Sequence, residues 1–247
     1  MTHPDSWRGL RALTPARIAL GRAGASLPTG EVLAFQLAHA RARDAVQHPA
    51  DLEAVERACA AAGLAPMRVS SRVPDAVDYL TRPDLGRRLD PADAERLGAA
   101  AAGCDAVLVI GDGLSGLAVE RHAVPLAARV TARLAEAGWR LGPVVVARFA
   151  RVALGDEIGE RLGARMVAVL IGERPGLSSP DSLGVYLTWE PRVGRTDAER
   201  NCLSNIRPAG LAIERAAEKL AWLMTEARRR ALTGVDLKED AGGELLR

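Results

Sequence analysis

Short apolar runs, each followed by a polar or glycine-rich turn, most constrain the fold of this chain. Three of them cover residues 105–110, 143–147 and 166–171, and stretches with helical spacing separate them. Apolar runs of this length that end at turn residues are typical of buried strands. Strands that alternate with helices predict a parallel sheet with helices packed on it. We therefore expect an α/β fold with a doubly wound, mostly parallel sheet.

Further elements surround these strands. Residues 184–189 alternate as a fourth strand does, and residues 156–162 form a short helix. A helix is expected from Leu117 to Gly138, and Pro125 within it can bend it. A terminal helix from Ala209 to about Leu232 has one apolar face, made of Ile213, Ala216, Leu220, Leu223 and Ala227.

The first part of the chain is mostly helical. One helix begins at Thr29 or Gly30 and ends near Gln47, and its spacing predicts an inward apolar face of Val32, Phe35, His39, Ala42 and Val46. A second helix covers 49–62, and residues 67–73 suggest a short strand. We expect a helical N-terminal region over 1–95 and a ligand-binding α/β domain over 96–247.

Composition excludes several classes of protein. The net charge of +2 is too small to indicate nucleic acid or a membrane surface as a partner. The three cysteines form no CxxC pair, which suits a reducing cytoplasm, and the four histidines have no metal-ligand spacing. No run of about 18 apolar residues occurs, so we expect no transmembrane helix.

The turns after the three buried strands are the expected site. Ligands of open parallel sheets bind beyond the carboxyl ends of the strands. The turns at 111–116, 151–157 and 172–176 offer backbone groups, carboxylates and arginines at that edge. Such a mixture suits a large ligand with amides, hydroxyls and one phosphate better than a bare anion.

The turn from Gly111 to Gly116 matches G-x-G-x-x-G, the dinucleotide fingerprint. An NAD-dependent oxidoreductase is therefore an alternative. Two features oppose it: no acid follows the second strand until Asp156, and Asp112 places a carboxylate where a phosphate would sit. The turn can also be a glycine-rich strand-to-helix connection with no ligand. For the chain as a whole, a stand-alone, non-enzymatic ligand-binding or regulatory module is a further alternative.

Longer strings identify a family. Leu170 to Ser179 and Pro191 to Arg207 closely resemble the small subunit of ethanolamine ammonia-lyase. Gly111 to Ser115, Arg151 to Glu160 and Thr14 to Arg22 match it as well, in the same order along the chain. The resemblance covers about residues 14–235.

The resemblance implies a function. Enzymes of this family use adenosylcobalamin to convert ethanolamine to acetaldehyde and ammonia by a radical mechanism. The small subunit completes the cobalamin site on a large subunit that holds most of the substrate contacts, in a heteromeric complex. Its cobalamin-binding domain is Rossmann-like, so the resemblance implies a Rossmann-like fold for 96–247.

The resemblance also implies site residues. Family cofactor contacts fall on Val152, Glu173 and Cys202, the last in what we expect to be a long loop before the terminal helix. Asp112 and Arg174 are weaker candidates, at the cofactor or the subunit seam. We expect no catalytic side chain and no metal ligand from this chain.

Two further expectations concern the cobalt and the location. The string Asp-x-His-x-x-Gly, which supplies a histidine to cobalt in many cobalamin domains, does not occur, so we expect the cofactor to keep its own base on the metal. We expect a cytoplasmic protein. Family members often carry a longer N-terminal extension, so enclosure in a bacterial microcompartment is left open. The N-terminal helices and the cationic loop 17–29 are the expected surface for the large subunit.

Overall fold

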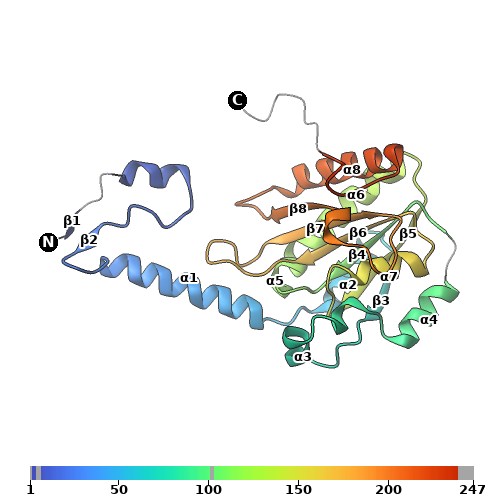
Figure 1. Ribbon diagram of the computed structural model, residues 1–247, viewed down its shortest axis with the longest axis horizontal. Helices are drawn as coiled ribbons and strands as arrows, with labels where there is room; N and C mark the ends of the chain where they lie inside the picture. Colours follow the sequence, from blue (N-terminus) through green and yellow to red (C-terminus); the bar gives the residue numbers. More distant parts are fainter. Residues whose placement is uncertain (1, 4–6, 101–102, 239–247) are drawn as a thin grey trace.

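The computed structural model describes residues 2–3, 7–100 and 103–238. Its centre is a six-stranded sheet with helices on both faces (Figure 1). In spatial order the strands are β3 (Pro66–Ser70), β5 (Leu141–Arg148), β4 (Ala106–Gly111), β6 (Met166–Gly172), β7 (Leu183–Trp189) and β8 (Arg200–Ile206).

The sheet is mostly parallel, as the sequence predicts. β3, β5, β4 and β6 pair in parallel, whereas β7 runs antiparallel to both β6 and β8. The carboxyl ends of β4, β5 and β6 therefore meet at one edge. We call the turns at this edge, 112–115, 149–153 and 173–176, the carboxyl rim.

Helices cover each face of the sheet. One face carries α2 (Leu52–Ala61), α6 (Val124–Glu136) and α8 (Ile213–Arg230), and the other carries α4 (Pro91–Ala99) and α7 (Leu154–Arg161). Along β4, Leu108 and Ile110 join the first core and Val107 and Val109 the second. Both faces of the central strands are thus buried, which explains their continuous apolar runs.

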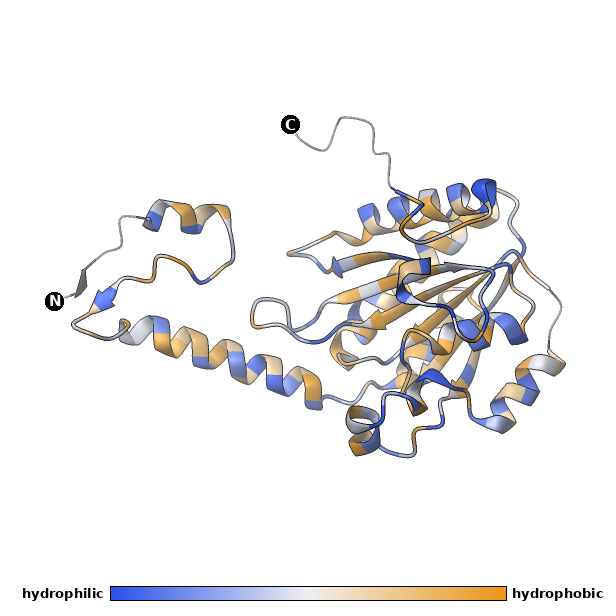
Figure 2. Ribbon diagram, viewed as in Figure 1, coloured by the Kyte–Doolittle hydropathy of each residue, from blue (hydrophilic) through white to orange (hydrophobic). Residues whose placement is uncertain are grey.

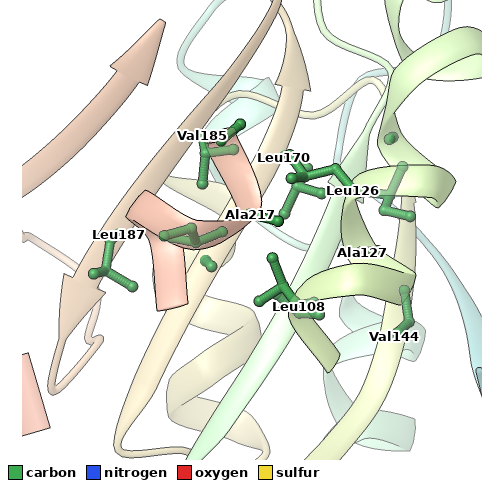
Figure 3. Close-up of a cluster of buried hydrophobic side chains, with 14 of the residues drawn as sticks. Leu108, Leu126, Ala127, Val144, Leu170, Val185, Leu187 and Ala217 are labelled. Carbon is green, nitrogen blue, oxygen red and sulfur yellow. The ribbon is translucent and has the colours of Figure 1, made fainter. Parts of the chain in front are cut away.

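Figure 3 shows the first core, in which side chains from the sheet meet those of α6 and α8. Leu108 and Leu170 from the central strands lie opposite Leu126 of α6, and all three are 3% exposed or less. Ala217 of α8 is fully buried there. Small residues of this kind let the two helices lie close to the sheet, which accounts for the alanine content of the chain.

The predicted helix over 117–138 is present in three parts. They are α5 (Gly116–Ala118), a π-helical segment η3 (Val119–Ala123) and α6. Pro125 lies in the first turn of α6, directly after the π segment. Because proline has no N–H to donate, a wider turn before it accommodates the missing hydrogen bond and the chain stays helical.

The N-terminal residues form an arm. The arm consists of residues 7–47: η1 (Arg8–Leu13), the short strand β2 (Arg22–Ala23), which pairs with β1 (Thr2–His3), and α1 (Thr29–Gln47). Figure 1 shows α1 extending away from the sheet, and Figure 2 shows apolar residues along it.

The prediction that α1 buries an apolar face was wrong. Of its residues only Ala45 is buried, and Phe35, His39 and Val46 are exposed. Leu33 is 58% exposed and Leu37 is 52% exposed. Helical spacing shows which side of a helix is apolar, but it does not show which surface covers that side.

Strand β3 is part of the central sheet, and helix α2 packs on that sheet. β3 pairs with β5 along its whole length, and Val55 and Cys59 of α2 enter the first core. Residues before position 95 thus supply an edge of the sheet. The remaining elements are α3 (Ala76–Thr81), η2 (Leu85–Arg87) and η4 (Asp197–Glu199).

The expected long loop before the terminal helix was a wrong prediction, because residues 200–206 form strand β8.

A buried ion pair anchors the first residue of β8. Arg200 Nη1 and Nη2 donate to Asp156 Oδ1 and Oδ2 at 2.6 and 2.7 Å, and Nη1 also donates to Thr188 Oγ1 at 2.8 Å. The two charged side chains are 2% and 1% exposed. The pair ties α7 to β8.

Replacement of Asp156 by Ala should strongly destabilise the chain. It leaves the Arg200 guanidinium buried without its carboxylate, and removal of one partner of such a pair costs about 3–5 kcal/mol. Chemical denaturation, followed by circular dichroism, measures the loss of unfolding free energy.

Asp197→Ala is the matched control. This carboxylate lies 3.5 Å from Arg200 Nε but is fully exposed, so its loss should cost less than about 1 kcal/mol. Equal losses in the two variants would contradict the anchoring role of the buried pair.

Candidate functional site at the carboxyl rim

A cavity of about 430 Å³ opens at the carboxyl rim. It is lined by Val152 from the turn after β5, by Glu173 and Arg174 from the turn after β6, and by Tyr186 of β7. Three of the five site residues predicted from sequence therefore share one cavity. Its other lining residues are Tyr79, Gly113, Leu114, Arg151, Ile171, Gly172 and Ser204.

Glu173 is held in place by three donors. Its carboxylate accepts hydrogen bonds from Ser182 Oγ, from Ser204 Oγ at 2.6 Å and from the backbone N–H of Asn205 at 3.1 Å. A Cβ added to Gly184 would lie 2.9 Å from Glu173 Oε1, so this glycine leaves the space that the side chain occupies. The carboxylate is thus a fixed, preorganised acceptor at the wall of the cavity.

Cys202 lies beside the cavity and does not line it. It is in β8, opposite Tyr186 of β7, and its side chain is exposed. Burial raises the pKa of both groups, and each lies close enough to shift the pKa of the other. Cys202 therefore neighbours Tyr186, which lines the cavity wall. Burial raises the pKa of the Cys202 thiol, so the residue is not set up as a nucleophile.

The Asp112 carboxylate bonds to the backbone of the turns after β4 and β5. It accepts from the backbone N–H groups of Phe149 at 2.6 Å, Ala150 at 2.8 Å and Gly113 at 2.9 Å. Burial raises the pKa of Asp112 to about 6, against the lowering effect of these donors. The structure thus places this candidate as a clamp that joins the β4 and β5 turns.

The backbone N–H groups of the G-x-G-x-x-G turn that would bind a pyrophosphate are bonded within the chain. The N–H of Gly113 donates to Asp112 Oδ1 and the N–H of Leu114 donates to the Gly172 carbonyl at 2.9 Å. A Cβ on Gly116 would lie 2.6 Å from the Ala50 backbone nitrogen. The glycines serve close packing of chain on chain, and the NAD alternative has no support from this geometry.

A second cavity of about 410 Å³ adjoins the first and shares Tyr79, Gly113 and Leu114 with it. It lies between the segment 46–50, helix α3 and the turn after β4. Val77 and Leu80 of α3 flank it and are 71% and 56% exposed. The rim therefore offers a polar cavity and an apolar one side by side.

Sequence reasoning missed Tyr79, Tyr186 and Ser204. Tyr79 lies in α3, a segment with weak periodicity, and its hydroxyl donates to the Ala150 carbonyl at 2.8 Å. The Arg151 guanidinium lies 4.1 Å from the centre of its ring. The rarity of tyrosine could have pointed to Tyr79 and Tyr186, since the chain has only two tyrosines and both line the same cavity.

The described residues contain no group of three or more His, Cys, Asp or Glu side chains that could hold a metal ion. Nor does any described helix combine the length and apolar character that a membrane span needs. What remains is an open α/β sheet with a preorganised carboxylate and hydroxyls at its rim, beside an apolar arm. These features define an α/β chain with a polar cavity at its sheet edge and an uncovered apolar surface.

Comparison with known proteins gives the family. The family described as ethanolamine ammonia-lyase light chain matches residues 4–238. The chain is 61% identical over 246 residues to the ethanolamine ammonia-lyase small subunit of Rhodopseudomonas palustris, covering 98% of this chain and 94% of that protein. It is 57% identical to the protein of that name from Ralstonia nicotianae, over 98% and 91% of the two chains. The chain belongs to the ethanolamine ammonia-lyase light chain family.

The raised pKa of Asp112 predicts a pH-dependent stability. Because the folded chain holds this proton more tightly than the unfolded chain, the stabilisation is full below about pH 4. It is lost as the pH rises through the folded pKa of about 6. The loss amounts to as much as about 3 kcal/mol.

Asp112→Asn removes this titration and is the reference. The unfolding free energy of both chains is measured from pH 4 to pH 7. As the pH rises, the native chain should lose unfolding free energy relative to Asp112→Asn. A constant difference would show that the three N–H donors offset burial, and a difference of opposite sign would show that they outweigh it.

Proposed function

We propose that this chain is the small subunit of an ethanolamine ammonia-lyase, a carbon–nitrogen lyase that converts ethanolamine to acetaldehyde and ammonia. The observation that carries the proposal is family membership over nearly the whole chain, at 61% identity to a protein of that name. We propose that it acts only together with a large subunit, which supplies most of the substrate contacts.

Adenosylcobalamin is the proposed cofactor, and when bound it supplies the radical chemistry of the reaction. The rim residues fit one edge of such a group. A fixed carboxylate can accept from amide N–H groups, hydroxyls can donate, and the adjoining cavity offers an apolar surface. The two cavities measure about 430 and 410 Å³, which suits an edge of a corrin, so a second chain must enclose the rest.

The proposed contacts differ in kind. Glu173 accepts hydrogen bonds from the edge of the cofactor, and Val152 packs against it. Arg174 is exposed at the mouth of the cavity and can meet the cofactor or the large subunit. Cys202 contributes through its strand and through Tyr186, and Asp112 acts indirectly, because it holds the turns after β4 and β5 together.

The large subunit is proposed to contact the N-terminal arm. The arm exposes Leu33, Phe35 and Leu37, and few residues of its own chain cover them. Arg17 in the loop 17–29 donates to the Leu177 carbonyl at 3.4 Å, which links the arm to the chain segment after Glu173. A partner that binds the arm would thus also lie near the rim.

Two sequence-based expectations stay proposals. We propose a partner-contacting role for residues 1–95 and cofactor binding for residues 96–247, with the qualification that β3 and α2 complete the sheet. A cytoplasmic location, or enclosure in a bacterial microcompartment, likewise stays a proposal.

Glu173→Ala should weaken cofactor binding in the complex of both subunits. The loss of a charged acceptor is worth about 1.5–3 kcal/mol, so the dissociation constant for adenosylcobalamin should rise about tenfold to hundredfold. Absorbance titration of the co-purified complex measures this constant, and ammonia release with and without adenosylcobalamin measures the activity.

Glu95→Ala is the control, since Glu95 is exposed on α4 and lines neither rim cavity. Its complex should bind the cofactor as the native complex does. Native affinity in the Glu173→Ala complex would remove Glu173 from the site. Absence of ammonia release from the native complex with adenosylcobalamin would reject the proposed function.

A further inference from the structure

Tyr186 lies where the three family-implied contacts converge. It occupies the middle of β7, paired with Val169 of β6 and with Cys202 of β8. Its ring packs in the same cluster as Val152, and both line the rim cavity together with Glu173. Gly184, two residues earlier on the same face of the strand, leaves the space into which the Glu173 side chain folds. A tyrosine and a carboxylate thus stand side by side on one wall.

The Tyr186 hydroxyl is a proton donor with a weak partner. Burial raises its pKa to about 12, with the Cys202 sulfur and Glu173 as further causes, so the phenol stays protonated near neutral pH. Its neighbour on β8 is Cys202, whose sulfur is a weak acceptor, so the hydroxyl can donate to an oxygen acceptor that enters the cavity.

The other tyrosine of the cavity contrasts with it. The Tyr79 hydroxyl donates to the Ala150 backbone carbonyl at 2.8 Å and is buried among Phe149 and Arg151. Tyr79 therefore uses its hydroxyl to hold the turn after β5. Tyr186 lines the same cavity, and its hydroxyl donates to no backbone carbonyl of the described residues, so it is the tyrosine that is free to bind a ligand.

The adjacent acceptor and donor match one functional group. A primary carboxamide presents N–H donors and a carbonyl acceptor side by side, and Glu173 and Tyr186 present the complementary pair. We propose that Tyr186 is a further cofactor-binding residue, whose hydroxyl donates to the carbonyl oxygen of a carboxamide that Glu173 binds through its N–H groups. This inference rests on the proposed function, in which a carboxamide-bearing corrin occupies the rim.

The test removes the hydroxyl and keeps the ring. Tyr186→Phe, in the co-purified complex of both subunits, should raise the dissociation constant for adenosylcobalamin about threefold to tenfold, the range for one hydrogen bond. Its melting temperature without cofactor should match that of the native complex. Tyr79→Phe is the comparison: it should lower the melting temperature, because the Ala150 carbonyl loses its donor, and change the dissociation constant less than Tyr186→Phe does.

A second readout separates binding from a general effect on structure. Cobalamin derivatives with one side-chain carboxamide converted to a carboxylic acid are titrated into the native and the Tyr186→Phe complexes. Tyr186→Phe changes the dissociation constant by some factor for each derivative. For one derivative this factor should differ by threefold or more from the factor for the parent cofactor. The same effect across all derivatives would overturn the carboxamide contact.

The outcomes distinguish this inference from the function on which it rests. Native affinity in Tyr186→Phe, with weakened binding in Glu173→Ala, would reject the role of Tyr186 and leave the proposed site intact. Native affinity in both variants would reject the proposed cofactor edge itself.

Discussion

The buried ion pair between Asp156 and Arg200 holds the two walls of the rim cavity together. Asp156 lies in the first turn of α7, directly after the turn that carries Val152, and Arg200 begins β8, which carries Cys202 and Ser204. Both charged side chains are removed from water, so each must find its hydrogen-bond partners in the other. The bidentate contact between them provides these hydrogen bonds. Together with the pairing of β8 to β7, it fixes β8 against the turn after β5.

Carboxylates at the rim serve two different purposes. Asp112 accepts from three backbone N–H groups, so it mainly joins the turns after β4 and β5, and it also lines the adjoining cavity of about 410 Å³. Glu173 is held by hydroxyls and one N–H at the wall of a cavity, where it can accept further donors. Under the proposed function this chain builds only part of a binding site, and such a part gains from this rigidity because it then needs no reordering when the partner and cofactor bind.

The sequence predicted the central strands, the parallel sheet and the edge at which Val152, Glu173 and Arg174 gather, because apolar runs and turns report burial directly. It did not predict β8, whose first residue is a buried arginine and whose Asn201, Ser204 and Asn205 are typical of a loop. That strand depends on a partner 44 residues away, Asp156, which no local pattern shows. The prediction that α1 buries its apolar side was wrong for a related reason. Few residues of the chain cover that side, and no local pattern shows this.

The central claim is that the carboxyl rim of this chain grips one edge of adenosylcobalamin while a large subunit encloses the remainder. An electron cryomicroscopy map of the co-expressed complex with adenosylcobalamin tests it most directly. The account predicts corrin density against Val152 and within hydrogen-bond distance of the Glu173 carboxylate. Cofactor density enclosed by the large subunit alone, or lying against the arm, would contradict it.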